Sequence, residues 1–339
     1  MIKIKNRRYI GNKSKLTENI YEALINSIEP NEKLTTFLDL FAGTGVVSEF
    51  FSDRGFKVLI NDILYSNYVA YEAFFSNENF SSNKVNKYLE FYNNLEYHEI
   101  DNNYFSAVYG EKYFSINDAK KAGFIREHIE HSKYDLSKRE YFILLTSLLY
   151  SVDKIANTVG HFEHYLKKKP ADRNFKLGIL DNLTPRDAQL YNVDANELSK
   201  IVSADVAYID PPYNARQYIN FYHVLENLAR WEKPTEFEGI SMKFKRNHLK
   251  SGYSQSKAKF LMADLVEGLK AKYIIVSYNN TYNAKSGASN NKISELEILE
   301  ILQEKGATKK YDIPYKSFNS GKTNFENHIE KIFVCKVGQ

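Results

Sequence analysis

Apolar residues fall into two alternating spacings along the chain. Short apolar runs predict strands at 36–40, 57–60, 205–209 and 273–277, and helical spacing predicts helices at 16–28, 46–51, 221–231 and 294–305. Strands that alternate with helices favour right-handed crossover units and a doubly wound, mostly parallel α/β sheet. Two later segments, KKYDIPY and HIEKIFVCKV, predict antiparallel strands that close the sheet.

The alternation loosens between residues 76 and 190. This stretch is polar and rich in tyrosine, as in NKYLEFYNNLEYHEIDNNYF, and one of its segments, YFILLTSLLYSV, is typical of a buried helix. We therefore predict one domain made of residues 1–75 and 191–339, with residues 76–190 inserted as a separate, largely helical module.

The composition is that of a globular protein, with 43% hydrophobic residues. No apolar run approaches the roughly 20 residues of a membrane span, and the opening MIKIKNRRYIGNK lacks the apolar core of a signal peptide. Cys335 is the only cysteine, which excludes a disulfide framework and favours a reducing, cytoplasmic location. The eight histidines show no ligand spacing, so we predict no metal. The lack of a membrane-spanning run predicts no membrane partner.

A glycine turn follows the first predicted strand, in FLDLFAGTGVVS. Gly43 and Gly45 permit positive φ and let a ligand lie against the backbone. Ligands of such sheets bind beyond the carboxyl ends of the strands. An ordinary strand-to-helix turn is the alternative. A Walker phosphate loop is excluded because no Gly-Lys-Ser/Thr follows, and the third glycine of the dinucleotide fingerprint is replaced by Ser48.

Asp62 comes directly after the second predicted strand. A carboxylate at this position can accept both ribose hydroxyls of a nucleoside. The alternative is that Asp62 caps the helix that begins near Tyr65. The glycine turn upstream favours the nucleoside role.

The segment YIDPPYNARQY continues the apolar run 205–209. Its prolines, Pro211 and Pro212, remove two backbone donors and hold the loop rigid, which leaves the Pro211 carbonyl as an acceptor. Asp210 supplies a second acceptor. The two groups can take both hydrogens of an exocyclic amine and turn its lone pair toward a methyl donor. Tyr213 offers a flat face for stacking on the base.

At these motifs the chain resembles the Dam-like DNA adenine-N6 methyltransferases of restriction–modification systems. RRYIGNKSKL, FAGTG and DPPY occur in the family's order, and the resemblance is weak from Ser76 to about Asn157. It implies a Rossmann-like methyltransferase core, S-adenosylmethionine as cofactor and double-stranded DNA as substrate. It also implies that residues 76–190 recognise the target sequence and that a cognate restriction endonuclease acts on the same site.

The resemblance also assigns residues to the cofactor. The methionine end of the cofactor would be lined by Tyr9, Gly11 and Lys13, and the cofactor's backbone would be surrounded by Asp39, Phe41, Gly43 and Gly45. Asp210 is also assigned to cofactor binding. Asp62 would hold the ribose. Asp194 matches the place where the family contacts the cofactor's adenine, and a helix cap is the alternative for it.

Two basic clusters lie outside these motifs. One consists of Lys167, Lys168, Lys169 and Arg173, and the other contains Lys243, Lys245 and Arg246. Such runs are usually solvated faces. Beside a base-modifying site they are candidate phosphate contacts, because the backbone supplies much of the affinity for DNA.

The target atom follows from the first position of DPPY. By the resemblance, aspartate there goes mostly with adenine N6, and serine is common for cytosine N4. Asp210 therefore favours N6 of an adenine that is flipped out of the duplex. An RNA base methyltransferase is one alternative, and a non-catalytic nucleic-acid-binding protein is another.

Overall fold

The computed structural model describes residues 1–281, 287, 290–314 and 329–338. The chain forms two compact units. The sheet unit consists of Asn12–Ile63, Ala188–Tyr218 and Lys250–Gln339. The helical unit consists of Met1–Gly11, Leu64–Asp187 and Ile219–Leu249. Each unit is therefore assembled from three separate stretches of chain.

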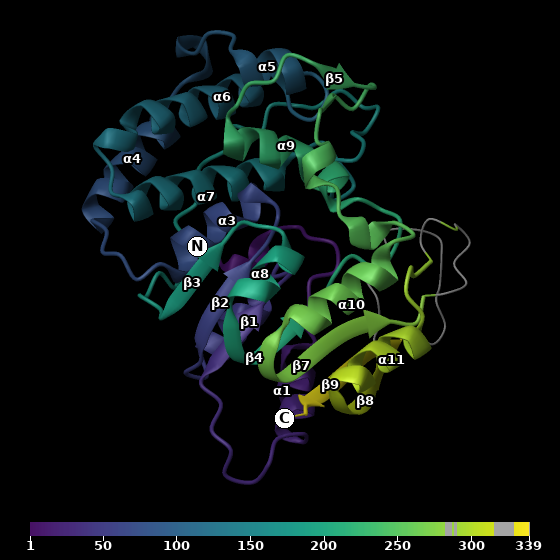
Figure 1. Ribbon diagram of the computed structural model, residues 1–339. Helices are drawn as coiled ribbons and strands as arrows, with labels where there is room; N and C mark the ends of the chain where they lie inside the picture. The colour runs from purple at the N-terminus through teal and green to yellow at the C-terminus, as the bar shows by residue number, and fades with distance from the viewer. Residues whose placement is uncertain (282–286, 288–289, 315–328, 339) are drawn as a thin grey trace. The chain divides into compact units, whose positions relative to one another are not determined.

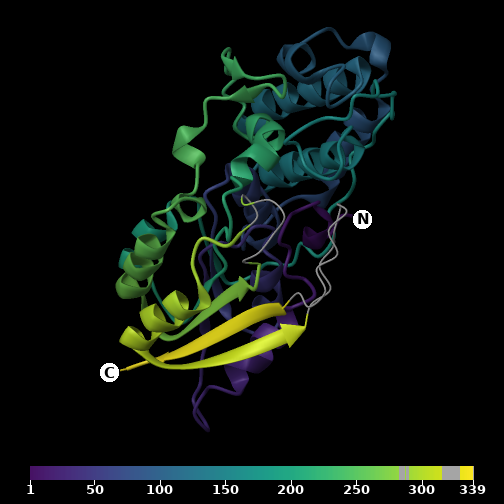
Figure 2. The same cartoon turned by 90° about the vertical axis from the view of Figure 1, so that its right-hand side faces the viewer.

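The described part of the sheet unit contains a seven-stranded sheet of order β3-β2-β1-β4-β7-β9-β8 (Figure 1). In this sheet β9 runs antiparallel to both of its neighbours, β7 and β8, and the other pairings among these strands are parallel. Figure 2 shows β9 and β8 side by side at one edge. The strands are β1 (Thr36–Asp39), β2 (Lys57–Asn61), β3 (Ala188–Tyr191), β4 (Ser203–Ile209), β7 (Lys270–Asn279), β8 (Gly306–Pro314) and β9 (Ile329–Val337).

Helices cover both faces of this sheet. Figure 1 shows α8, α10 and α11 over one face, and α1 and α2 pack on the other. The alternation of side chains along β1 explains this, because Phe37 stacks on Phe51 of α2 with ring centroids 3.8 Å apart while Leu38 joins the core under α10 and α11. The helices are α1 (Thr17–Ile25), α2 (Val46–Ser52), α8 (Ala195–Ile201), α10 (Ala258–Gly268) and α11 (Glu295–Lys305), with a 3-10 turn at Gly252–Ser254.

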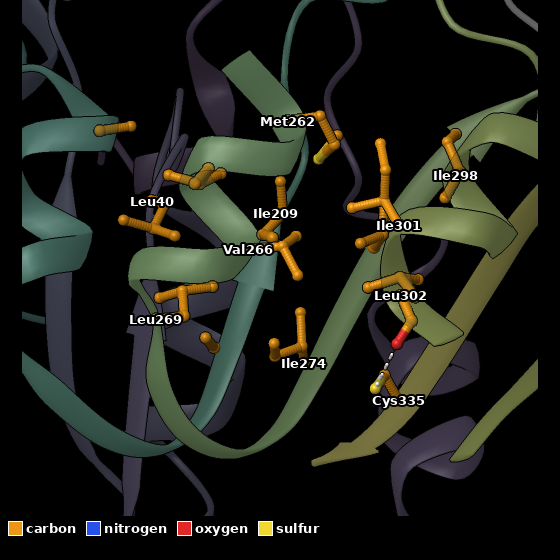
Figure 3. Packing of buried hydrophobic residues seen from close by; sticks show 14 of the residues in the cluster. Leu40, Ile209, Met262, Val266, Leu269, Ile274, Ile298, Ile301, Leu302 and Cys335 are labelled. Carbon is orange, nitrogen blue, oxygen red and sulfur yellow. Dashed lines mark hydrogen bonds between the residues drawn. The ribbon is translucent and has the colours of Figure 1, made fainter. Parts of the chain in front are cut away.

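The core on the α8, α10 and α11 face is aliphatic (Figure 3). Ile209 and Ile274 of the central strands face Val266 of α10 and Leu302 of α11. Cys335 of β9 is buried in the same cluster, and its Sγ donates to the Leu302 carbonyl at 3.2 Å. The only cysteine of the chain therefore serves packing.

The strand order reverses between β1 and β4. The chain runs outward from β1 through β2 to β3 and then returns to place β4 on the other side of β1. In open α/β sheets, ligands bind beyond the carboxyl ends of the strands at such a switch point. The segments after Asp39 and Ile209 leave the sheet there, and both carry motifs that the sequence singles out.

The helical unit consists mainly of α-helices, with one small hairpin. Its α-helices are α3 (Tyr65–Phe75), α4 (Ser82–Asn94), α5 (Tyr104–Tyr109), α6 (Ile116–His131), α7 (Lys138–Ile155) and α9 (Tyr218–Arg230). The hairpin pairs β5 (Phe237–Glu238) with β6 (Lys243–Phe244). Short 3-10 turns lie at Ile4–Asn6, Tyr97–Glu99, Ser132–Tyr134 and Asn247–Leu249.

Buried charges join the helices of this unit. Glu226 of α9 is fully buried and accepts from the backbone N–H groups of Tyr65 and Ser66 at 2.8 and 2.9 Å, at the start of α3. Arg126 of α6 donates to the carbonyls of Leu228 and Ala229 at the end of α9. A carboxylate at the start of a helix and a guanidinium at the end of a helix both interact favourably with the helix dipole.

The structure confirms the doubly wound, mostly parallel sheet, and the two antiparallel strands at its edge. The predicted helix 16–28 is shorter, because α1 ends at Ile25. The compact unit that contains most of residues 76–190 also takes in residues 1–11, 64–75 and 219–249. The assignment of 76–190 to target recognition stays a prediction. Among the described residues, no helix is both long and apolar enough to span a membrane.

We expect Phe51→Ala to destabilise the protein by about 3–5 kcal/mol, because it removes the ring that stacks on Phe37 and leaves a cavity. Phe50→Ala is the matched control, since Phe50 is only half-buried. Urea unfolding of both variants measures the difference. Equal losses of stability in the two variants would contradict the packing described for α2.

Candidate functional site

The glycine turn after β1 requires both of its glycines. Gly43 has a φ of 55° and Gly45 a φ of 83°, a region that side-chain-bearing residues rarely adopt. The turn is closed by the Gly45 N–H, which donates to the Ala42 carbonyl at 2.7 Å, and α2 begins directly after it. The backbone of the turn thus lies at the carboxyl edge of the sheet.

Asn61, at the end of β2, holds the neighbouring strand ends in place. Its Nδ2 donates to the carbonyls of Leu40 and Val193, both at 3.1 Å, and its Oδ1 accepts from the Val193 N–H at 3.1 Å. One side chain therefore joins the carboxyl ends of three strands. Sequence analysis did not select Asn61, although its place at a strand end beside Asp62 was a usable signal.

Asp62 is tied to the glycine turn. Its Oδ2 accepts from the Gly43 N–H at 2.9 Å. The helix that follows, α3, has Leu64 as its N-cap with no side-chain cap hydrogen bond. The N-cap position is thus occupied by Leu64 and not by Asp62, which argues against the capping alternative. The Asp62 carboxylate lies at the edge where a ligand of the sheet would bind.

Asp39 ends β1 and is almost completely buried. Its Oδ2 accepts from Ser48 Oγ at 2.7 Å, and its buried Oδ1 has no hydrogen-bond partner among the described residues. Burial raises the pKa of Asp39 to about 8, and the negative charges of Asp210 and Asp62 raise it further. Three carboxyl groups thus act on one another at the switch point, and one buried oxygen is left for a ligand.

Asp210 accepts from two groups through one oxygen. Lys13 Nζ lies 3.2 Å from Asp210 Oδ1, and the Tyr213 hydroxyl donates to the same oxygen. Lys13 is itself buried and also lies 3.4 Å from Oε2 of Glu330 on β9. Burial raises the pKa of Asp210 to about 6, and Lys13 opposes this rise.

Of two carbonyl groups in the DPPY segment, those of Pro211 and Tyr213, only that of Tyr213 accepts hydrogen bonds from the described residues. The Tyr213 carbonyl accepts from the Lys292 N–H at 2.8 Å and from the Tyr278 hydroxyl at 3.2 Å. The Pro211 carbonyl accepts no hydrogen bond from the described residues. This agrees with the expectation that the Pro211 carbonyl stays available as an acceptor.

Asp194 caps a helix, which is the alternative that the sequence left open for it. Its Oδ1 accepts from the N–H groups of Asn196 and Glu197 at 2.9 and 3.3 Å, which caps α8. The residue is exposed. Capping explains the aspartate without a cofactor, so its contact with the cofactor's adenine stays a prediction.

The first motif is divided between the units. Tyr9 and Gly11 belong to the helical unit, where the Tyr9 ring stacks on Tyr222 at 4.6 Å and the Ile10 N–H donates to the Tyr222 hydroxyl at 2.7 Å. Gly11 has a φ of 79°. Lys13 belongs to the sheet unit. The structure therefore brings Lys13, Asp39, Asp62 and Asp210 to one sheet edge, and the roles of Tyr9 and Gly11 stay predictions.

Both basic clusters lie in the helical unit. Lys167, Lys168, Lys169 and Arg173 are exposed, and Lys169 pairs with Glu111 at 2.6 Å. In the second cluster Lys245 pairs with Glu236. Lys243 is half-buried. Whether these residues contact phosphate stays a prediction.

Arg246 differs from the other basic residues because it is only 6% exposed. Its guanidinium donates to Asn220, to Glu238 at 2.9 Å and to the Phe244 carbonyl at 2.9 Å. These bonds tie the β5–β6 hairpin to α9. These buried contacts indicate that Arg246 has a structural role. From the sequence alone, Arg246 could not be distinguished from the exposed lysines of the same run.

The chain matches the family model described as D12 class N6 adenine-specific DNA methyltransferase over residues 9–286. It is 35% identical to modification methylase StsI of Streptococcus sanguinis, over 96% of this chain and 51% of that protein. It is 34% identical to type II methyltransferase M.FokI of Planomicrobium okeanokoites, over 92% and 50%. This chain therefore spans about half the length of these two relatives. With type II methyltransferase M.NlaIII of Neisseria lactamica it shares 32% identity over 94% of this chain and 95% of that protein. The chain belongs to the D12 class of N6 adenine-specific DNA methyltransferases.

Proposed function

We propose that the protein transfers a methyl group from S-adenosylmethionine to N6 of an adenine in double-stranded DNA. The observation that carries the proposal is the pair of acceptors after β4, Asp210 and the unbonded Pro211 carbonyl, beside the glycine turn of β1. Membership in the D12 class supports the choice of adenine. The second candidate base, cytosine, has an exocyclic amine that the same acceptors could hold.

The residues at the switch point fit a cationic cofactor. Asp39, Asp62 and Asp210 bring three carboxyl groups to one sheet edge, where a cation would favour their ionised forms, and Asp39 Oδ1 is a buried acceptor without a partner among the described residues. S-adenosylmethionine carries a sulfonium and an ammonium group and supplies an activated methyl. Asp39, Gly43, Gly45 and Asp62 would hold it, together with the other residues proposed from the family pattern, Tyr9, Gly11, Lys13, Phe41, Asp194 and Asp210.

The DPPY residues would orient the amine of the base. Asp210 and the Pro211 carbonyl accept its two hydrogens, so that its lone pair faces the methyl donor. As the nitrogen gains positive charge, the Asp210 carboxylate stabilises it, which is electrostatic catalysis rather than strong general-base catalysis. Holding both reactants in line removes much of the entropic barrier.

The target base must leave the duplex before it can react. Flipping costs on the order of a few kcal/mol, and stacking on the Tyr213 ring would offset part of this cost. Tyr213 is held by its hydroxyl bond to Asp210 and by its carbonyl bonds, so its ring is pre-oriented. Pro212 keeps the loop rigid between these two groups.

The remaining parts of the proposal concern DNA and partners. We propose that the helical unit, including residues 76–190, selects the target sequence, and that its candidate phosphate contacts are Lys167, Lys168, Lys169, Arg173, Lys243 and Lys245. Arg246 would serve these contacts only indirectly, by holding the β5–β6 hairpin against α9. We also propose a cytoplasmic location and a cognate restriction endonuclease, since relatives are named modification methylases. Among the described residues no group of three or more His, Cys, Asp or Glu is arranged to hold a metal ion.

The direct test is to identify the methylated nucleoside. Duplex DNA treated with the protein and labelled cofactor is digested, and mass spectrometry should find the label in N6-methyladenine. Ribosomal RNA under the same conditions should remain unlabelled. Label found only in N4-methylcytosine, or only in RNA, would overturn the proposal.

The two acidic residues should fail in different ways. Asp210→Ala should abolish methyl transfer and leave the Kd of the cofactor within roughly tenfold, because Asp210 acts on the amine. Asp62→Ala should weaken cofactor binding first, with turnover recovered at high cofactor concentration. Calorimetry and initial rates separate the two. Turnover that survives in Asp210→Ala would refute the assignment.

Cofactor affinity should rise with pH between 6 and 7.5. A cation at the switch point favours the ionised form of Asp39, whose pKa in the free protein is about 8, so binding releases a proton and the Kd falls as pH rises. Asp39→Asn should weaken binding and flatten this dependence. Asp205→Asn is the control, since that carboxylate has a lowered pKa and bonds to Thr35 and Lys272 away from the turn. A Kd that does not change with pH would contradict the prediction.

A further inference from the structure

Lys13 lies between two carboxylates, Asp210 and Glu330, and only Asp210 belongs to a motif. Its Nζ is 3.2 Å from Asp210 Oδ1 and 3.4 Å from Glu330 Oε2. Glu330 lies in β9, where it pairs with Asn279 at the carboxyl end of β7. It is only 5% exposed in a strand that is otherwise largely apolar. Glu330 also lies outside residues 9–286, which match the family model.

A buried carboxylate is costly unless a partner compensates it. An apolar residue at position 330 would avoid this desolvation cost. We therefore look for a role of the Glu330 carboxylate in the site. Among the described residues, Lys13 places its ammonium 3.4 Å from the Glu330 carboxylate. Two carboxylates therefore share one buried cation.

This sharing bears on the reacting amine. The negative charge of Asp210 stabilises the nitrogen as it becomes positive. A close ion pair with Lys13 would offset that negative charge and weaken the stabilisation. Glu330 draws on the same ammonium. The more Lys13 is held by Glu330, the less its positive charge offsets the ionised Asp210 carboxylate at the amine.

We propose that Glu330 is a positioning residue that holds the Lys13 ammonium and so limits how far Lys13 neutralises Asp210. This inference rests on the proposed methyl transfer. It adds a residue of β9 to a site that the motifs place on β1, β4 and the segment before α1.

The titratable and charged groups around Asp210 determine its pKa, and therefore the pH dependence of the reaction. They are Lys13 from the segment before α1, Tyr213 from the loop itself, Tyr208 from β4, Asp39 from β1 and Glu330 from β9. Lys13 and the Tyr213 hydroxyl lower the pKa of Asp210, and Glu330 raises it. Loss of the Glu330 charge therefore lowers the pKa of Asp210.

The test is Glu330→Gln. We expect kcat to fall by about tenfold, with the Kd of the cofactor nearly unchanged. We also expect the acidic limb of the pH–rate profile to move to lower pH by about one unit, because Lys13 then pairs with Asp210 alone. A merely structural role would not move this limb. Glu295→Gln is the matched control, since Glu295 pairs with Lys331 at 2.6 Å, next to Glu330, and with Lys310.

A second readout is independent of activity. The carboxyl carbon of Asp210, labelled with carbon-13 and assigned by comparison with Asp210→Asn, should titrate at lower pH in Glu330→Gln than in the wild type. If the wild type methylates nothing but this shift is seen, the proposed function fails and the ion sharing stands. If Glu330→Gln does not fold, Glu330→Asp keeps the carboxylate, and the Asp210 titration should stay close to that of the wild type. An unmoved titration and pH profile in Glu330→Gln, or a shift as large in Glu295→Gln, would overturn the inference.

Discussion

The parallel pairing of β1 with β4 is the constraint on which the site depends. Its register sets Asp39 opposite Tyr208, so the two chains leave the sheet side by side at the same edge. The glycine turn and the DPPY segment are far apart in sequence, and this pairing alone makes them neighbours. Asn61 then fixes the end of β1 against β2 and the segment after β3. A shift of register would separate the acceptors from the turn even with every motif intact.

Sequence reasoning found the parts of the site that lie at strand ends. FAGTG and DPPY could be recognised because glycine and proline constrain the backbone locally, so their meaning does not depend on distant residues. Asp62 followed from the same logic. Six strands of the sheet were predicted from apolar runs, including its antiparallel edge at β8 and β9. The strand β3 was missed, because its half-exposed residues form no apolar run.

The parts that sequence reasoning missed depend on distant contacts. Glu330 lies in a strand whose pattern shows only that one face is buried, and nothing local indicates that its carboxylate meets Lys13 more than 300 residues away. Arg246 belongs to a basic run that looks uniform in sequence, although its own guanidinium is buried. Asp194 shows the converse, since a local helix cap accounts for it.

The division of both units into three stretches has a consequence for synthesis on the ribosome. The edge of β1 that pairs with β4 must wait while residues 40–202 are made, and at 5–20 residues per second this takes roughly 8–33 s. During this time β1 exposes an unpaired apolar edge, the kind of surface on which strands from other chains can add. During translation, β1 must therefore be protected from pairing with other chains. In the finished protein β2 and β4 cover both of its edges.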